Sequence, residues 1–422
     1  MKPLVVFNCG QLLSFRGPRL PRIKSEMADV GLVRNGAVLV RGGSIEVVGS
    51  LTEVRRALNS RQARWLNAQG RVVLPGFVDS HTHALFARSR VDDYAAQIQG
   101  ATYESLAKAG GGIQASARHM KATSEPKLAA QLDRIGSRFL EYGTTTAEVK
   151  SGYGLEPAQE LKMLRAIRRA SEHSWFDWVP TLLIHDVPAA TLRKRRARFL
   201  RVAVPALIRE VARRQLADFF DVFCDRGFFS VPETRGMLLA AARAGLKLKA
   251  HAEQLAHTGA ARLAAQLGAV TVDHVDRVRS ADIRVLKRAS TIATLLPGSV
   301  FHLGSGCFPP ARKLIEAGVP VALATNFNPG SSPTVNMQMI LSLACGYLRM
   351  TPAEALTAAT INGAWAAGCE ERVGSLEAGK QADLVIMDVD DYRELPYFFG
   401  MNHCLTVIKK GHVVFSKTAA QV

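Results

Sequence analysis

The segment VVLPGFVDSHTH, residues 72–83, decides the fold expected for this chain. It is an apolar run rich in strand-forming residues, and it ends in two histidines separated by one residue. Because alternate side chains of an extended strand point to the same face, His81 and His83 project together. Two neutral imidazoles on one side of a rigid strand make half of a metal site. The alternative is a pair of histidines in a polar loop at the end of a strand.

Apolar strands alternate with amphipathic helical stretches after this segment. With the strand that precedes His81, eight strands are expected, the others at residues 144–149, 178–184, 219–223, 246–250, 269–272, 291–296 and 319–324. Repeated βα units of this number predict an α/β protein built on a (β/α)₈ TIM-like barrel. A doubly wound sheet is the structural alternative, which strand counting leaves open.

Both ends of the chain read as short strands. Residues 36–40 and 44–49 flank a glycine-containing turn and predict a hairpin, and residues 405–414 have a similar character. We expect the two ends to pair in one small β-sandwich domain, into which the barrel is inserted. The expected division is residues 1–70 for the N-terminal part of the β domain, 71–365 for the barrel and 366–422 for the C-terminal part.

The composition describes a soluble globular protein, with 48% hydrophobic and 21% charged residues among 422. No apolar stretch reaches the ~18 residues that a membrane span needs, and the N-terminus reads as a first strand rather than a signal peptide. The six cysteines are scattered without a C-x-x-C pair. This usage predicts reduced thiols in a cytoplasmic protein, not a disulfide framework.

The net charge of +18 invites a nucleic-acid interpretation. The densest basic run, residues 193–196, is followed by apolar residues at helical spacing, which indicates a solvated helix face. Few aromatic residues accompany it, so no nucleic-acid partner is expected. The charge could instead help to attract anionic metabolites.

Polar residues collect just after the expected strands. His185, His251 and His274 follow three of them, in addition to His81 and His83. In a barrel these strand ends meet at one mouth, where catalytic residues lie. Five histidines at such positions favour a shared metal site over five separate structural histidines.

Several longer segments carry a family resemblance. They include PGFVDSHTHALFARSR, QGATYESLAKAGGGI, TTTAEVKSGYGLEPAQELKMLRAI, KAHAEQL, TVDHVD, NFNPGSSPT and GSLEAGKQADLVIMD, and they span most of residues 74–388. The chain resembles the amidohydrolase superfamily and, within it, the imidazolonepropionase family. The H-T-H motif marks the superfamily, whereas the GATYE, AGGGI, EVKSGYGL and FNPGSSP blocks are particular to imidazolonepropionases.

The resemblance implies hydrolytic ring opening of 4-imidazolone-5-propanoate to N-formimidoyl-L-glutamate in histidine degradation. It implies one divalent metal ion, zinc or iron, held by His81, His83, His251 and position 326, with His274 near the metal-activated water. It also implies a small-molecule substrate and, as the family expectation, a homodimer. The substrate or product contacts that it implies are Arg90, Tyr153, His185, Gln254, Asn328, Gly330 and Ser331.

These roles agree with the chemistry of the side chains. Arginine binds a carboxylate through a two-pronged contact, so Arg90 suits the propionate tail. His274 can stabilise an oxyanion or relay a proton. Glu253 lies two residues after His251. We expect it to be a structural or supporting carboxylate, with proton transfer as the alternative.

One position departs from the family pattern, which has aspartate where this chain has Asn326. Asparagine offers a neutral carbonyl oxygen and cannot act as a base. The chain is therefore either an active variant with His274 as the base, a weakened or inactive ligand-binding paralogue, or a substituted form that traps substrate. Another cyclic amidohydrolase or a deaminase is the alternative enzyme. Lys150, which is carboxylated and bridges two metals in some superfamily members, is expected to be unmodified here.

Overall fold

The computed structural model describes residues 2–58, 62–101, 110–188 and 195–417. Most of the expected GATYE block and the first two residues of the basic run at 193–196 lie outside these ranges. All six cysteines lie in the described ranges and are free.

Eight parallel strands form the barrel, as the sequence predicts. They are hydrogen-bonded in chain order from β6 to β13. The strands are almost wholly buried, because helices cover the outer face of the barrel and neighbouring side chains fill its inside. Their bounds are β6 Phe77–Asp79, β7 Thr144–Lys150, β8 Asp177–Ile184, β9 Phe219–Cys224, β10 Lys247–Ala252, β11 Thr271–His274, β12 Ile292–Leu295 and β13 Val321–Leu323.

Hydrogen bonds just beyond the strands bring the first and last strands of the barrel together. The Asn326 backbone N–H donates to the His81 carbonyl oxygen at 3.1 Å, and the His83 N–H donates to Phe327 at 2.9 Å. The buried Asp79 carboxylate accepts from the Thr325 N–H at 3.1 Å. These bonds hold the H-T-H segment against position 326, although almost 250 residues separate them.

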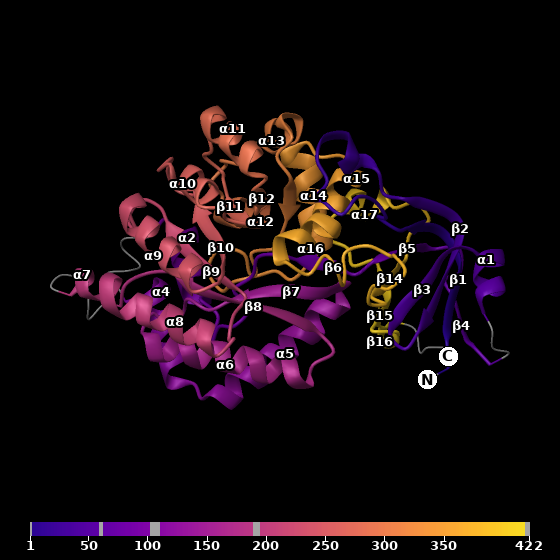
Figure 1. The fold of residues 1–422 in the computed structure, drawn as a ribbon, viewed down its shortest axis with the longest axis horizontal. Helices are drawn as coiled ribbons and strands as arrows, with labels where there is room; N and C mark the ends of the chain where they lie inside the picture. Colours follow the sequence, from indigo (N-terminus) through magenta and orange to yellow (C-terminus); the bar gives the residue numbers. More distant parts are fainter. Residues whose placement is uncertain (1, 59–61, 102–109, 189–194, 418–422) are drawn as a thin grey trace.

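Helices surround the barrel, and most of them bury one apolar face against it (Figure 1). Helix α9 shows how they begin: Ser230 and Glu233 form a reciprocal capping box, and a proline occupies the first turn. The helices of the barrel region are α2 Val91–Ile98, α4 Gly112–Ala122, α5 Glu125–Glu141, α6 Pro157–His173, α7 Arg196–Arg198, α8 Val204–Arg213, α9 Val231–Arg243, α10 Ala260–Gln266, α11 Ser280–Ala289, α12 Pro297–Leu303, α13 Ala311–Ala317, α14 Met337–Leu348, α15 Pro352–Ala359 and α16 Ile361–Ala367.

Both ends of the chain share one mixed sheet at the side of the barrel (Figure 1). Its eight strands are hydrogen-bonded in the order β16-β15-β14-β5-β1-β2-β3, with β4 paired to β1. Apolar clusters lie against this sheet, one of them closed by α1 Leu51–Ala57. The strands are β1 Leu4–Leu13, β2 Leu32–Arg41, β3 Ser44–Ser50, β4 Arg64–Asn67, β5 Val72–Pro75, β14 Leu384–Met387, β15 Cys404–Lys409 and β16 His412–Ser416; the short helices η1 Lys24–Ala28, η3 Phe199–Ala203 and α17 Glu394–Tyr397 complete the described elements.

The N-terminal domain boundary lies one strand later than the expected residue 70. Strand β5 pairs with β1 and β14, so it belongs to the terminal sheet, and the chain enters the barrel at Gly76. A Cβ at Gly76 would lie 2.2 Å from the Thr145 Oγ1 atom, so only glycine fits this crossing. The sequence pattern predicts one strand where the structure has β5 and β6, because a single apolar run covers both.

A buried ion cluster connects the terminal sheet to the barrel. Lys409 of β15 is fully buried and lies 2.8 Å from Asp177, at the start of β8, and 2.6 Å from Asp383. Lys410 approaches the same Asp177 carboxylate at 2.8 Å. The contacts of Asp177 join residues 232 and 233 positions apart and fix the sheet against the barrel.

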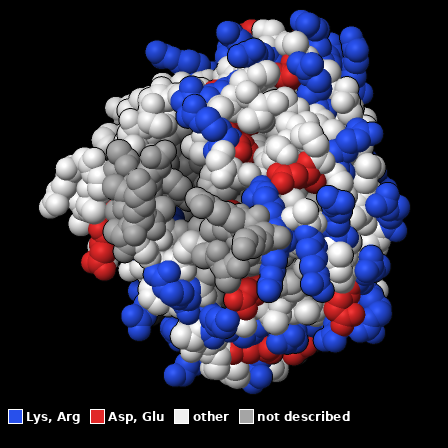
Figure 2. All heavy atoms as spheres, turned by 90° about the vertical axis from the view of Figure 1, so that its left-hand side faces the viewer, with Lys and Arg blue, Asp and Glu red and all other residues white. Residues whose placement is uncertain are grey.

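Basic side chains are scattered over the face of the molecule that carries α7 and α9 (Figure 2). Acidic and uncharged residues separate them there, so the excess charge on this face is distributed. Within the described ranges, none of the helices is long and apolar enough to cross a membrane.

Candidate active site

The strand ends bring four histidines into mutual contact. His81 and His83 directly follow β6, His251 lies near the end of β10, and His274 ends β11. The ring centroids of His81 and His251 are 4.5 Å apart, and those of His83 and His251 are 5.3 Å apart. His274 lies 5.7 Å from His81 and 5.4 Å from His251. The convergence expected at the barrel mouth is therefore present.

Two carboxylates orient two of these rings. Asp273 lies 2.7 Å from His81 Nδ1, and Asp221 lies 3.0 Å from His251 Nδ1. A carboxylate on one ring nitrogen fixes the tautomer and leaves the other nitrogen free to bind a metal. The His81 Nε2 atom is accordingly buried without a hydrogen-bond partner among the described residues.

The spacing of the free nitrogens suits a tetrahedral metal. His83 Nε2 and His251 Nε2 are 3.3 Å apart. Two nitrogen ligands of tetrahedral zinc, each bonded at about 2.0–2.1 Å, lie roughly 3.3 Å from each other. Burial lowers the pKa of both His81 and His83 well below the usual value, with neighbouring cationic groups adding to the effect. Both rings are therefore neutral near pH 7, the form that binds metals.

Asn326 lies against the H-T-H segment, because its backbone N–H donates to the His81 carbonyl oxygen. Its side chain is buried, and its Nδ2 donates to the Ser299 hydroxyl at 2.6 Å. Its Oδ1 is buried without a hydrogen-bond partner in the described part of the chain. Three imidazoles and one such oxygen are a donor set that fits a divalent metal ion.

Lys150 occupies the layer beneath the histidines and is surrounded by carboxylates. Its Nζ lies 2.7 Å from Asp221, 2.8 Å from Glu148 and 3.4 Å from Asp273. Burial alone would lower the pKa of Lys150, but these carboxylates outweigh burial and raise it. A carboxylated lysine would add a negative charge among them, so this environment favours the expected unmodified ammonium.

A second possible ligand grouping includes His274. One ligand atom from each of His81, His251 and His274 lies within 4.8 Å of the others. Another such grouping joins His81, Glu148 and Asp273, but the Lys150 ammonium already lies between those two carboxylates.

Arg90, Tyr153 and His185 lie on the His83 side of this position. The Tyr153 ring is 5.7 Å from His83, and the His185 ring is 6.2 Å from His83. Burial raises the pKa of the Tyr153 phenol to about 12, while Arg90 opposes the shift, so the phenol stays protonated. Burial, together with the nearby His251 and Arg90, lowers the pKa of His185 to about 3, so this ring stays neutral.

Gly330 allows Arg90 to reach the site. A Cβ at Gly330 would lie 1.3 Å from Arg90 Nη2. The Asn328 side chain shapes the loop around this contact, because its Oδ1 accepts from the Gly330 and Ser331 N–H groups at 2.8 Å each. Asn328 and Ser331 are therefore brought together with Arg90, as the sequence predicts. Their side chains also bond to each other, Asn328 Nδ2 to Ser331 Oγ at 2.9 Å.

Glu253 and Gln254 diverge after His251. Both Glu253 oxygens accept backbone N–H bonds, from Thr258 at 2.7 Å and Gly259 at 2.9 Å. Both oxygens of this carboxylate are therefore bonded to the backbone of the turn that precedes α10. Gln254 is half-buried, and its backbone N–H donates to Asp225 at 2.8 Å, which holds the residue at the barrel mouth.

Sequence reasoning did not single out Asp221, Glu148, Lys249 or Ser299, and it considered Asp273 only as a neighbour. The available signal was a charged residue inside an apolar strand, as in FFDVFC around Asp221. Such residues are too costly to bury unless they are paired. Their partners come from other strands, so the pairing itself could not be read locally.

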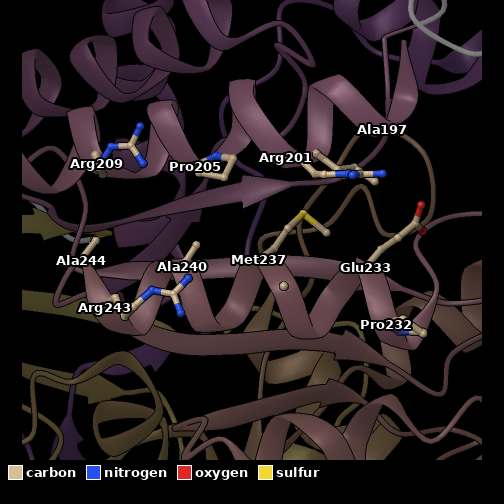
Figure 3. A pocket seen from close by; sticks show the side chains of 12 residues that line it. Ala197, Arg201, Pro205, Arg209, Pro232, Glu233, Met237, Ala240, Arg243 and Ala244 are labelled. Carbon is tan, nitrogen blue, oxygen red and sulfur yellow. The ribbon is translucent and has the colours of Figure 1, made fainter. Parts of the chain in front are cut away.

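A groove of ≈ 690 Å³ lies on the outside of the barrel, between α8 and α9 (Figure 3). Arg201, Arg209 and Arg243 line it together with the apolar side chains of Met237 and Ala240. None of the clustered histidines lines it, so this groove is separate from the candidate active site.

Similarity to known proteins first defines the class to which this chain belongs. The model of the amidohydrolase family matches residues 72–414, which is most of the chain. The fold agrees with solved structures of low sequence identity, among them a zinc-bound adenosine deaminase from Xanthomonas campestris (TM-score 0.71, 20% identity, 97% of this chain and 92% of that one). E. coli guanine deaminase gives a TM-score of 0.72 at 18% identity, with 99% and 100% of the two chains covered.

Relatives of higher sequence identity identify the family within this class. The imidazolonepropionase of Geobacillus kaustophilus is 43% identical over 98% of this chain and 98% of its own length. That of Solibacter usitatus is 41% identical over 99% of this chain and 100% of its own. The chain therefore belongs to the imidazolonepropionases of the amidohydrolase family, and the resemblance drawn from the sequence is confirmed. Membership supports a divalent metal at the site whose donors are described above.

Proposed function

We propose that this chain hydrolyses 4-imidazolone-5-propanoate to N-formimidoyl-L-glutamate, a step of histidine degradation, at the mouth of its barrel. One observation carries the assignment of the site. The convergent nitrogens of His81, His83 and His251 share the mouth with the guanidinium of Arg90. Metal donors next to a carboxylate-binding group are what a cyclic amide with a propionate tail requires.

Arg90 binds the propionate of the substrate, and the loop carrying Gly330 leaves room for its guanidinium. The protonated Tyr153 phenol and the neutral His185 ring donate hydrogen bonds to the substrate on the same side. Gln254, Asn328 and Ser331 complete the pocket. The Tyr153 phenol and the His185 ring each keep one protonation state near neutral pH. The hydrogen-bond donors that they offer to the substrate therefore do not change with pH in this range.

A divalent metal, zinc or iron, when bound by His81, His83, His251 and Asn326, makes water nucleophilic near neutral pH and polarises the ring carbonyl. His274 is the base, because its imidazole lies beside His81 and His251 and because a pKa lowered chiefly by burial keeps the ring neutral and able to accept a proton. It accepts the proton of the attacking water and returns it to the ring nitrogen as the C–N bond breaks. Asn326 cannot share this task, since its amide does not take up a proton near neutral pH.

The test is an assay that follows loss of the imidazolone ultraviolet absorbance, combined with metal analysis of the same sample. We expect ring opening with about one metal ion per chain. His274→Ala should keep the metal and lose roughly 10²–10⁴-fold in kcat, whereas His173→Ala, at an exposed position in α6, should match the parent. Loss of metal from His274→Ala would make His274 a ligand, and ring opening by metal-free protein would overturn the metal-dependent mechanism.

Asn326→Asp tests whether position 326 limits the reaction. A carboxylate adds a charged ligand and a second base, so turnover should rise while metal content stays equal or increases. A rate that is unchanged or lower would count against a ligand or base role for this position. Binding of substrate in calorimetry without ring opening, with either metal, would instead identify an inactive relative.

A further inference from the structure

The structure points to Ser299 as a positioning residue for the metal site, acting through the side-chain amide of Asn326. We propose that the Ser299 hydroxyl selects the amide orientation in which oxygen, and not NH₂, faces the metal. The inference rests on the proposed metal role of Asn326 and concerns a contact that a carboxylate at this position would not need.

The geometry of the two side chains supports this. Ser299 lies in the first turn of α12, immediately after β12, and its side chain is buried. Asn326 Nδ2 donates to Ser299 Oγ at 2.6 Å. The Asn326 Oδ1 atom therefore points away from Ser299, and it is buried without a partner in the described ranges. A buried amide oxygen without a donor is costly, and a cation would satisfy it.

Hydrogen bonds also fix the backbone of Asn326, so rotation of its side-chain amide is the conformational freedom that remains. Its N–H donates to His81 at 3.1 Å, and its carbonyl oxygen accepts from Asn328 Nδ2 at 2.6 Å. Its φ of 50° lies in the left-handed region, which asparagine tolerates better than most residues. Rotation of the side chain by half a turn would place the partially positive NH₂ beside the metal.

The chemistry distinguishes asparagine from aspartate here. A hydroxyl that accepts from the amide NH₂ increases the negative character of the amide oxygen and so strengthens it as a ligand. An aspartate has two equivalent oxygens, so it needs no such selection. Ser299 would have to donate to an aspartate, which would draw charge away from the ligand. The contribution of Ser299 should therefore depend on which residue occupies position 326.

The experiment is a double-mutant cycle on zinc affinity, measured on the full chain. Metal is removed with a chelator, and zinc is titrated in competition with a chromogenic chelator. Ser299→Ala should weaken zinc binding about tenfold or more in the parent, as for other residues that orient a ligand. In the Asn326→Asp background the same change should alter the zinc Kd less than about twofold, because no amide remains to be oriented.

Ser332→Ala is the matched control. Its hydroxyl is buried in the neighbouring loop and donates to the Thr325 carbonyl at 2.6 Å, so it does not bond to the Asn326 amide. We expect it to leave zinc affinity unchanged in both backgrounds. Thermal unfolding of each metal-free variant checks that the fold is retained. If Ser299→Ala does not fold, Ser299→Thr, which keeps the hydroxyl, should bind zinc like the parent.

Two outcomes separate the inference from the proposed function. Equal losses for Ser299→Ala in both backgrounds, or no loss in the parent, would overturn the orienting role of Ser299 and leave the metal site standing. A parent chain that binds no zinc, or one whose zinc affinity does not respond to Asn326→Asp, would overturn the metal role of position 326 itself.

Discussion

At the scale of single residues, the site depends on buried histidines that remain neutral. His185 shows the effect best, since it is not proposed as a metal ligand. Burial, together with the nearby His251 and Arg90, lowers its pKa to about 3. In the unfolded chain a histidine titrates near 6.5. Between these values the unfolded state binds a proton that the native state does not.

The stability of the metal-free protein should therefore fall as the pH drops from about 6.5 towards about 3. Between about pH 7 and about pH 5, His185 alone should account for a loss of roughly 2 kcal/mol in the free energy of unfolding. Urea unfolding at the two pH values measures it, and the loss should be smaller by that amount in His185→Gln. The exposed His173→Gln should behave as the parent; equal losses in both variants would contradict the assignment.

At the scale of elements, the loop of residues 328–331 is shaped to admit Arg90. Gly330→Ala would place a Cβ 1.3 Å from Arg90 Nη2, so the guanidinium must move. The backbone itself would not be strained, because no positive φ is found at Gly330. Losing a charge-assisted contact to the substrate carboxylate should raise KM about tenfold or more, with a smaller change in kcat.

Steady-state kinetics on the imidazolone substrate measures this effect. Gly346→Ala is the matched control, because a Cβ there, within α14, meets nothing within 4 Å. An unchanged KM for Gly330→Ala would show that Arg90 does not bind the substrate tail.

The stability of the barrel also depends on Lys150, which is buried among carboxylates. Lys150→Met leaves Asp221, Glu148 and Asp273 without their shared cation. Removing one partner of a buried ion pair typically costs about 3–5 kcal/mol, and we expect a loss of this size in urea unfolding. The orientation of His81 and His251 should suffer as well, so zinc affinity should fall.

Lys121→Met is the control for Lys150→Met. Its ion pair with Glu156 is exposed to solvent, so it should change stability by less than about 1 kcal/mol. Similar small effects of both substitutions would mean that Lys150 does not neutralise the buried carboxylates.

At the scale of the whole molecule, the terminal sheet is held to the barrel through Asp177. Burial alone would raise the pKa of Asp177, but Lys409, Lys410 and Gln381 hold it well below its usual range. Asp177→Ala strands the buried Lys409 with one carboxylate, and it should lower the free energy of unfolding by about 3 kcal/mol. Asp390→Ala, at an exposed pair with Arg71, should have little effect in the same urea titration. Equal urea midpoints for Asp177→Ala and Asp390→Ala would show that the buried ion cluster does not stabilise the contact between the terminal sheet and the barrel.

Much of this architecture could be predicted from the chain alone. The eight barrel strands and the hairpin of β2 and β3 follow from local patterns of apolar residues and turns, which depend on neighbours a few positions away. The single apolar run of residues 72–78 misled the boundary prediction, because pairing partners and not hydrophobicity assign β5 to the terminal sheet. The histidines at the strand ends were foreseeable, since parallel strands of a barrel end at one mouth.

The sequence by itself thus determined the barrel, the group of histidines at its mouth and the departure at Asn326. Only the tertiary structure decided that Asp221 orients His251, that Asp273 orients His81 and that Ser299 turns the Asn326 amide. Such pairings join residues from different strands, up to 192 positions apart. Local patterns record which side chains are buried, whereas the partner of a buried charge is fixed only when the strands pack side by side.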